Sequence, residues 1–212
     1  MSAARLLLWR HGRTAANASG RFQGQLDVPL DAVGQVQIKE AAELLARVIG
    51  TASCRIVSSD LSRAHDTALA LGTRLGLSVT TDPALREISL GRWQGLNHDD
   101  VIAVEPEEFA AWRAGEDIRP GGGETRTEAA IRVERAILAH AEATPDDVLV
   151  IASHGGVIRG AIQRLIGIER WSPRLLAPIP NVHWSRLDRR PGGWILSAYN
   201  VGPLDGTVFP ER

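Results

Sequence analysis

Residues 5–14 read RLLLWRHGRT, an apolar run that ends in an arginine, a histidine and a glycine. Four consecutive large apolar residues are typical of a strand that is buried on both faces. Such a strand does not ordinarily end on two ionisable side chains, so Arg10 and His11 are candidate functional residues. The glycine that follows allows another stretch of backbone to approach closely.

Short apolar runs alternate with longer helical patterns along the rest of the chain. This alternation predicts an α/β fold, a three-layer sandwich with a mostly parallel sheet and helices on both faces. Strands are expected at 5–10, 55–60, 78–82, 148–154, 182–188 and 194–200, the last two as an antiparallel hairpin. Helices are expected at 32–49 (capped by Asp31), 61–75 (capped by Asp60), 124–143 and 157–168.

Length and composition favour one globular domain over residues 1–212, because 212 residues with 44% hydrophobic content can bury a sizeable core. Residues 97–123 break the alternation and are expected to form a small cap over the sheet. The formal net charge of -1 provides no broad basic surface, so neither nucleic acid nor a membrane is expected as a partner. The single Cys54 and the shortness of the apolar runs favour a cytoplasmic location.

The ends of the expected strands carry most of the polar motifs. His11 precedes Gly12 after the first strand, and His154 precedes Gly155 after the fourth. Ligands of open parallel sheets bind at the carboxyl ends of the strands, where the strand order reverses. A helix that opens at Gly155 would also present backbone N–H groups to an anion. The sequence therefore predicts an anion site at this edge.

Five motifs occur in an order that resembles the histidine phosphatase superfamily, in its phosphoglycerate-mutase-like branch. They are RHG (10–12), SSDLSRAHDTA (58–68), LREISLGRWQGL (85–96), GGGET (121–125) and ASHGGVI (152–158). The resemblance covers nearly the whole chain.

The resemblance implies a role for each motif residue. His11 would be the nucleophile that takes the phosphoryl group, with Arg10 and Arg63 holding the phosphate by charge. His154, with the N–H of Gly155, would stabilise the phosphate oxygens. Glu87 would donate a proton to the leaving alcohol and then activate water, and burial beneath the Trp93 segment would favour its protonated form. Asn17, Gln23 and Gly24 match positions that contact the phosphate or the near end of the substrate.

This scheme requires no metal and no other cofactor. The six histidines, at positions 11, 65, 98, 140, 154 and 183, include no pair at helical i, i+4 spacing that would indicate a zinc site.

Three functions are compatible with these motifs. The favoured one is a metal-independent phosphomonoesterase acting on a small phosphorylated metabolite. Within the family the motifs look most like those of glucosyl-3-phosphoglycerate phosphatases, with alpha-ribazole phosphatases and broad sugar-phosphate phosphatases close behind. A phosphoglycerate mutase is the second, although family mutases carry a longer insertion between the acid and the second histidine. A non-catalytic phosphate-binding protein is the third, and it would be expected to lack one of the core residues.

A homodimer is also expected, built partly on the C-terminal hairpin. Trp184 and Trp194 fall on strands at an edge of the sheet, and tryptophan is enriched at the centres of interfaces. The alternative is that both rings pack inward against a crossover helix.

Overall fold

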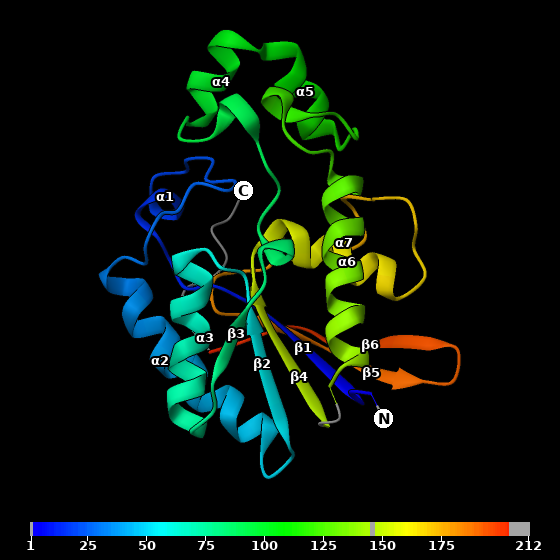
Figure 1. Cartoon of the computed structure of the whole chain (residues 1–212). Coiled ribbons are helices and arrows are strands. Elements are labelled where there is room, and N and C mark those ends of the chain that lie inside the picture. The colour runs from blue at the N-terminus through cyan, green and yellow to red at the C-terminus, as the bar shows by residue number, and fades with distance from the viewer. Residues whose placement is uncertain (1, 145–146, 204–212) are drawn as a thin grey trace.

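A mixed sheet forms the centre of the molecule (Figure 1). The computed structural model describes residues 2–144 and 147–203, and in these residues the strand order is β3-β2-β4-β1-β5-β6. The strands are β1 (Arg5–Arg10), β2 (Cys54–Ser58), β3 (Val79–Thr81), β4 (Val148–Ser153), β5 (Trp184–Arg190) and β6 (Gly193–Val201). The first four strands pair in parallel, whereas β5 runs antiparallel to both β1 and β6.

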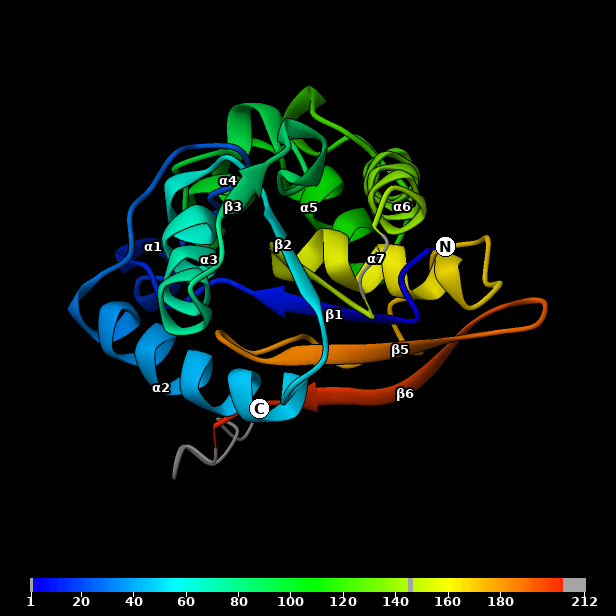
Figure 2. The same ribbon diagram turned by 60° about the horizontal axis from the view of Figure 1, so that its bottom comes forward.

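The helices lie on both faces of this sheet. They are α1 (Ala15–Ala18), α2 (Ala32–Ile49), α3 (Ser62–Leu75), α4 (His98–Val104), α5 (Pro106–Ala114), α6 (Arg126–Glu142) and α7 (Gly155–Leu165), with short 3-10 turns η1 (Pro83–Leu85), η2 (Gly91–Trp93) and η3 (Pro120–Gly122). In Figure 2 the strands lie between α2 on one side and α6 with α7 on the other. The predicted three-layer α/β sandwich is confirmed.

The two faces of β1 explain why its sequence is apolar throughout. Leu6 and Leu8 pack into a core with α6 and α7, whereas Leu7 and Trp9 pack into a second core with α2 and α3. All four side chains are fully buried. Because alternate residues of a strand face opposite sides, a central strand covered by helices on both faces has no polar position until it ends.

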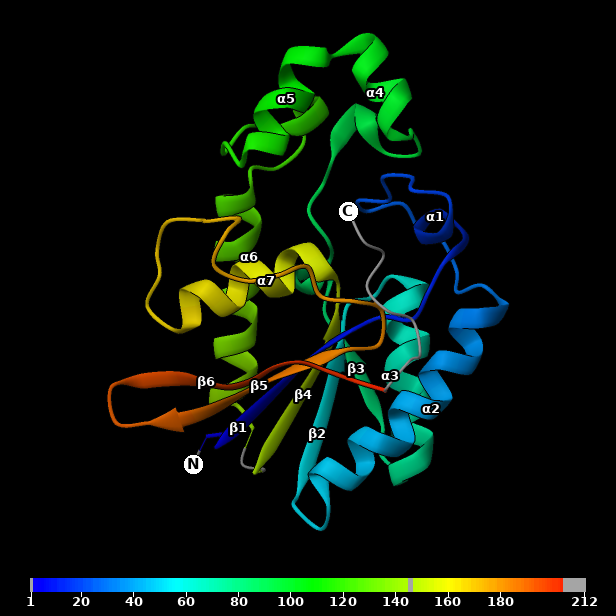
Figure 3. The ribbon, with the colours of Figure 1, turned by 180° about the vertical axis from the view of Figure 1, so that it is seen from behind.

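The cap predicted at 97–123 consists of α4, α5 and the η3 turn. It lies beyond the carboxyl ends of the parallel strands, as the views from opposite sides agree (Figures 1 and 3). An aromatic cluster joins α5 to η2 and to the segment after α1: Trp93 lies 5.6 Å from Phe22, 6.0 Å from Phe109 and 6.1 Å from Trp112 between ring centroids.

The sequence predicts the N-caps of two helices, and the structure confirms one of them and contradicts the other. Asp31 caps α2 as predicted, since its carboxylate accepts the N–H of Gly34 at 2.8 Å. The prediction that Asp60 caps α3 is wrong: the N-cap is Leu61, which makes no side-chain cap bond. Asp60 instead accepts two hydrogen bonds from the guanidinium of Arg86, at 2.7 and 2.5 Å. The bidentate pair gives the carboxylate two hydrogen bonds to a cation, whereas a cap would give it a bond to a neutral backbone N–H, which accounts for the difference.

Both tryptophan side chains of the C-terminal hairpin are buried in the cores of this protein. Trp184 is 3% exposed and packs with α2 and α3, while Trp194 is 8% exposed and packs with the opposite core. The inward-packing alternative describes them correctly, so neither ring is available at the edge of the sheet for a partner. Within the described ranges, no helix combines the length and apolar character needed to cross a membrane.

Gly12 and Gly34 allow the loop after β1 to lie directly against α2. A Cβ at Gly34 would lie 2.0 Å from the carbonyl oxygen of Arg13, and one at Gly12 would lie 2.9 Å from the carbonyl oxygen of Gly34. Both contacts are with backbone, which cannot swing away as a side chain can. This close approach fixes the path of the chain just after His11.

We expect Gly34→Ala to lower the free energy of unfolding by about 1–3 kcal/mol because of this backbone contact. The sign is informative, since alanine at an unobstructed helix position would raise stability by roughly 0.5–1 kcal/mol. Urea unfolding followed by circular dichroism measures the change. Gln35→Ala, at the next and exposed position, is the control and should stay within about 0.5 kcal/mol of the wild type. A stabilised Gly34→Ala protein would contradict the contact.

Candidate active site

The pairing of β1 with β4 brings the two histidines together. The strands are parallel and in register, with Arg10 opposite Ser153, and the N–H of His11 donates to the carbonyl of Ser153 at 3.1 Å. The residues that follow the two strands are His11 and His154, and their ring centroids lie 5.1 Å apart. Both rings are buried. They follow two neighbouring parallel strands at the point where the strand order reverses, which is where ligands of open parallel sheets bind.

A hydrogen bond to its own neighbour fixes the state of the His11 ring. Nδ1 lies 2.7 Å from the carbonyl oxygen of Gly12. A carbonyl oxygen only accepts hydrogen bonds, so Nδ1 carries the proton and Nε2 carries a lone pair. The N–H of Gly12 donates to Thr67 Oγ1 at 3.1 Å, and that hydroxyl donates to the carbonyl of Arg63 at 2.7 Å. These bonds tie the histidine to the start of α3.

Two arginines flank the histidines, Arg63 buried and Arg10 half-buried, and within the described residues neither is hydrogen-bonded to a carboxylate. Arg10 donates through Nη1 to the carbonyl of Ile179 at 2.5 Å. Arg63 donates through Nη1 and Nη2 to the carbonyls of Leu26 and Gly24, at 2.7 and 2.8 Å. Among the residues described, the Nε atoms of Arg10 and Arg63 are buried and have no hydrogen-bond partner. A buried donor without a partner costs about 1–3 kcal/mol, which a bound anion would remove.

His154 presents a third such nitrogen. Its Nε2 lies 2.9 Å from the hydroxyl of Ser59, and its Nδ1 is buried with no partner in the described structure. The Ser59 hydroxyl also accepts the N–H of Leu61 at 3.3 Å. In the described residues, Arg10, Arg63 and His154 therefore each have one buried side-chain nitrogen without a hydrogen-bond partner.

Glu87 is held at the N-terminus of α7. Its carboxylate accepts the N–H of Gly156 and the N–H of Val157, both at 3.0 Å, and the N–H of Ile88 at 3.0 Å. A helix N-terminus favours a negative charge. The sequence predicts that N–H groups at the start of this helix bind an anion. Two of them, those of Gly156 and Val157, instead bind the carboxylate of Glu87.

A pocket of about 210 Å³ connects most of these groups. Its lining consists of Arg10, His11, Asn17, Arg21, Phe22, Gln23, Gly24, Arg63, Glu87, Ile88, Leu90, Trp112 and Gly156. Of the nine residues expected at the site, seven line this pocket. His154 contacts the His11 ring but does not line this pocket, and Gly155 lines a smaller adjoining hollow instead.

The aromatic wall of the pocket is Trp112. Trp93, whose segment was expected to bury Glu87, is itself fully buried and donates its ring N–H to Glu105 at 2.5 Å. Its ring therefore supports the cap and does not cover Glu87. Arg21, Phe22 and Trp112 were not predicted as site residues, because the sequence contains no local signal for where the cap folds over.

The loop that carries Glu87 is clamped by an ion pair from α6, which the sequence did not reveal. Arg132 donates to the carbonyls of Ala84 and Arg86 at 2.9 Å and of Glu87 at 3.3 Å. The same guanidinium forms a bidentate pair with Glu124, at 2.9 and 2.7 Å. Glu124 belongs to the GGGET motif, so this motif acts by holding the Glu87 loop.

Burial is the main influence on the ionisation of the site. It lowers the pKa of His11 well below 6.5, and the guanidiniums of Arg10 and Arg63 lower it further. Burial and the charge of Arg63 likewise keep the pKa of His154 well below 6.5. Burial also lowers the pKa of Arg63 to about 10, so it remains charged at neutral pH. The site therefore combines neutral imidazoles with fixed positive charge.

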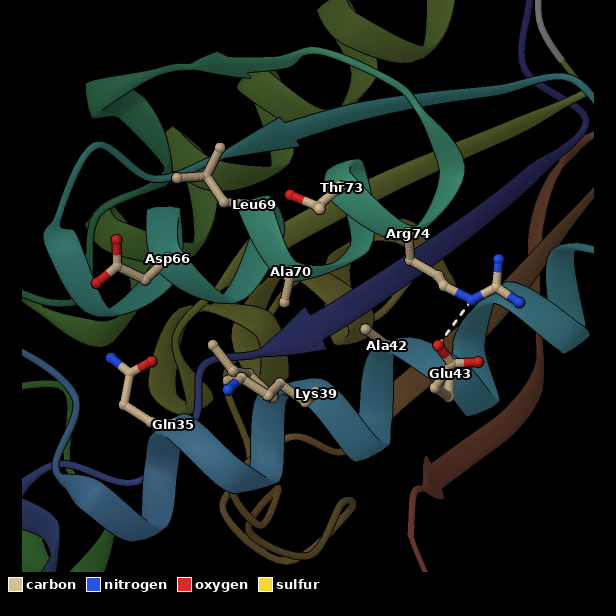
Figure 4. Close-up of a pocket in the computed structure, with 10 residues that line it drawn as sticks. Gln35, Lys39, Ala42, Glu43, Asp66, Leu69, Ala70, Thr73 and Arg74 are labelled. Atoms are coloured by element: carbon tan, nitrogen blue, oxygen red, sulfur yellow. Dashed lines mark hydrogen bonds and ion pairs between the residues drawn. The ribbon is translucent and has the colours of Figure 1, made fainter.

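A larger hollow, about 610 Å³, lies between α2 and α3 (Figure 4). Ile38, Ala42 and Ala70 contribute to its lining, and its charged residues have both signs, with Arg74 paired to Glu43 at 2.7 Å. It provides no concentrated positive charge for a phosphate. No group of three or more His, Cys, Asp or Glu side chains in residues 2–144 and 147–203 is placed to hold a metal ion.

These features define an α/β protein with an anion pocket at the carboxyl ends of its parallel strands. Residues 6–202 match the family model of the histidine phosphatase superfamily (branch 1), and this chain belongs to that family.

Named relatives lie in the same family. The chain is 39% identical over 203 residues, 92% of its length and 88% of the relative's, to glucosyl-3-phosphoglycerate phosphatase of Mycobacterium tuberculosis. It is 33% identical over 215 residues to a probable phosphoglycerate mutase of Salmonella paratyphi C, covering 96% of both chains. The solved structure of mycobacterial glucosyl-3-phosphoglycerate phosphatase with VO3 is similar at a TM-score of 0.85, with 37% identity, 94% of this chain and 100% of that one.

The depressed pKa values of His11 and His154 predict a loss of stability in acid. As the pH falls through about 6.5 the unfolded chain binds protons at both positions, whereas the folded chain does not. At pH 5.5 each histidine should reduce the free energy of unfolding by about 1.4 kcal/mol relative to neutral pH. Urea unfolding at pH 7.5 and 5.5 measures this. Between pH 7.5 and 5.5, the His11→Asn protein should lose about 1.4 kcal/mol less unfolding free energy than the wild type, because it lacks one of the two histidines. If it loses as much as the wild type, the depressed pKa of His11 is refuted.

Arg132 holds the Glu87 loop but does not line the pocket, so we expect its replacement to lower turnover through the position of that loop. Arg132→Gln should lower kcat about 10- to 100-fold on p-nitrophenyl phosphate, because the Glu87 loop is no longer fixed. Arg132→Lys should recover little, since a lysine cannot bridge three carbonyls and a carboxylate. Arg135→Gln, at an exposed position of the same helix, is the matched control. Equal kcat values for the Arg132 and Arg135 variants would show that the clamp is dispensable.

Proposed function

We propose that this chain is a metal-independent phosphatase that hydrolyses a small phosphate monoester through a phosphohistidine at His11. The single observation that carries the proposal is the state of the His11 ring. Its Nδ1 is bonded to the carbonyl of Gly12, so Nε2 has a lone pair, and the charges of Arg10 and Arg63 act on the ring. A neutral imidazole beside fixed positive charge is suited to attack a phosphate dianion.

In the first step His11 Nε2 attacks phosphorus and the bond from phosphorus to the ester oxygen breaks. Arg10 and Arg63 stabilise the equatorial oxygens through the charge of their guanidiniums as charge redistributes, and His154 adds a hydrogen bond from its ring. In the complex with substrate Glu87, on the pocket wall, carries a proton, because the phosphate dianion beside it disfavours a second negative charge. It gives this proton to the departing alkoxide, which leaves as an alcohol.

In the second step water replaces the alcohol. Glu87, now a carboxylate, takes a proton from the water as its oxygen attacks phosphorus, and the bond to His11 Nε2 breaks. Inorganic phosphate leaves and Glu87 is protonated again. No metal is needed, since the guanidiniums of Arg10 and Arg63 supply the positive charge.

Asn17, Gln23 and Gly24 would contact the phosphate or the first atoms of the substrate. Asn17 accepts the N–H of Thr14 through Oδ1 at 3.1 Å, which directs its amide nitrogen to other partners. The Gly24 carbonyl accepts from Arg63, so it orients the guanidinium rather than the phosphate.

Glucosyl-3-phosphoglycerate is our first candidate substrate, because two kinds of comparison name relatives that act on it. A phosphoglycerate mutase is the second candidate function. A relative of almost equal length carries that name, so the absence of a long insertion does not by itself separate the two activities. Alpha-ribazole phosphate is a further candidate substrate. A non-catalytic binding protein is disfavoured because no core motif residue is missing.

A substrate panel with a chemical trap tests the proposal. Glucosyl-3-phosphoglycerate, alpha-ribazole phosphate, 3-phosphoglycerate and sugar phosphates are assayed for phosphate release with and without chelator. We expect release that survives chelation and disappears in His11→Ala. Acid quenching with labelled substrate should trap an acid-labile, base-stable label on the wild type only. Conversion of 3-phosphoglycerate to 2-phosphoglycerate faster than phosphate release would favour the mutase, and label on His11→Ala would remove the nucleophile assignment.

The cytoplasmic location and the homodimer stay predictions. A dimer would have to use a surface other than the two buried tryptophans.

A further inference from the structure

A small hollow of about 190 Å³ adjoins the phosphate pocket. It is lined by Arg10, Glu87, Gly155, Gly156, Arg159, Pro178 and Ile179. Arg10, Glu87 and Gly156 line both spaces, so Glu87 stands at their common wall. A group joined to the oxygen that Glu87 protonates can therefore extend into this hollow, whose one ionisable residue not used so far is Arg159.

Arg159 is oriented by packing and by one hydrogen bond. It lies on α7 four residues after Gly155, on the same side of the helix. Its Nη2 donates to the carbonyl of Pro173 at 2.7 Å, and its guanidinium carbon lies 4.8 Å from the ring centroid of Trp171. Its Nε is buried and has no partner in the described part of the chain.

Within residues 2–144 and 147–203, Arg159 forms no ion pair with a carboxylate. Burial lowers its pKa, and the group that opposes this effect is the hydroxyl of Tyr199. Arg126 lies against the other aromatic rings, 3.3 Å from the centroid of Trp112 and 5.6 Å from that of Trp171. Burial, together with the charge of Arg159, lowers the pKa of Arg126 to about 10. Two partly buried cations thus lie close together beside the site.

We propose that Arg159 binds a carboxylate on the leaving group of the substrate, with Arg126 adding to the positive potential. This inference rests on the proposed function, because it places the leaving group beyond Glu87. Guanidinium groups favour carboxylates through charge-assisted hydrogen bonds. A 3-phosphoglycerate unit has its carboxylate two carbons from the carbon that bears the phosphate, a separation suited to two adjoining spaces with one shared wall.

The competing explanation is that Arg159 only braces the segment from Trp171 to Pro173. Such a role would affect every substrate equally. A pair of substrates that differ only in the carboxylate separates the two explanations: 3-phosphoglycerate carries it, and glycerol 3-phosphate has a hydroxymethyl group in its place.

We expect Arg159→Gln to lower kcat/KM for 3-phosphoglycerate about 10- to 100-fold, mainly through KM, and to leave glycerol 3-phosphate within about twofold. Arg159→Lys should recover part of the selectivity, because it keeps the charge. Arg74→Gln, whose side chain is exposed and paired with Glu43, is the control and should match the wild type on both substrates. Equal losses on the two substrates, or no loss on either, would overturn the proposal.

A binding measurement makes the test independent of turnover. Calorimetric titration of the His11→Ala protein, with and without Arg159→Gln, should show the same preferential loss of affinity for 3-phosphoglycerate. If the wild type releases no phosphate but this preference is present, the proposed function fails and the carboxylate subsite stands. If phosphate is released and the preference is absent, the subsite fails and the proposed function stands.

Discussion

The parallel pairing of β1 with β4 is the contact on which the site depends. Both strands are central, so their register is fixed by side chains packed on two faces at once. A slip of one residue would turn every side chain to the opposite face and would separate His11 from His154. The same pairing explains why two histidines 143 positions apart in the chain, at 11 and 154, meet edge to face. Core packing and site geometry are therefore one constraint.

Arginine serves two purposes in this chain, and its partner distinguishes them. Arg86 and Arg132 are paired with carboxylates and hold in place the segment that leads to Glu87. Arg10 and Arg63 donate to backbone carbonyls, which orient a guanidinium without neutralising it. Net positive charge consequently remains in the pocket. Its burial costs free energy in the empty protein, and that cost is recovered when an anion binds.

The sequence predicted what local pattern determines. Strand ends and first helical turns identified Arg10, His11 and His154, because apolar runs and helix signals locate those points on the chain. It did not reveal the pairing of Arg132 with the Glu87 carbonyl, 45 residues apart, or the replacement of an Asp60 cap by an ion pair with Arg86. It also did not identify Trp112 as a pocket residue, since the path of the cap depends on aromatic packing that no local pattern specifies. Polar contacts between residues far apart in the sequence can be identified only once the fold of the backbone is known.

The base of the cap is closed by backbone contacts. The N–H of Glu124 donates to the carbonyl of Ser89 at 2.8 Å, and a Cβ at Gly91 would lie 2.1 Å from the carbonyl oxygen of Gly121. The chain thus leaves the sheet and returns to it at nearly one point, so the cap is a loop whose ends stay fixed whatever lies between them. Lengthening a closed loop costs little entropy. During evolution, insertions and substitutions between these two points could redirect the family to new leaving groups while the phosphate machinery beneath stayed unchanged.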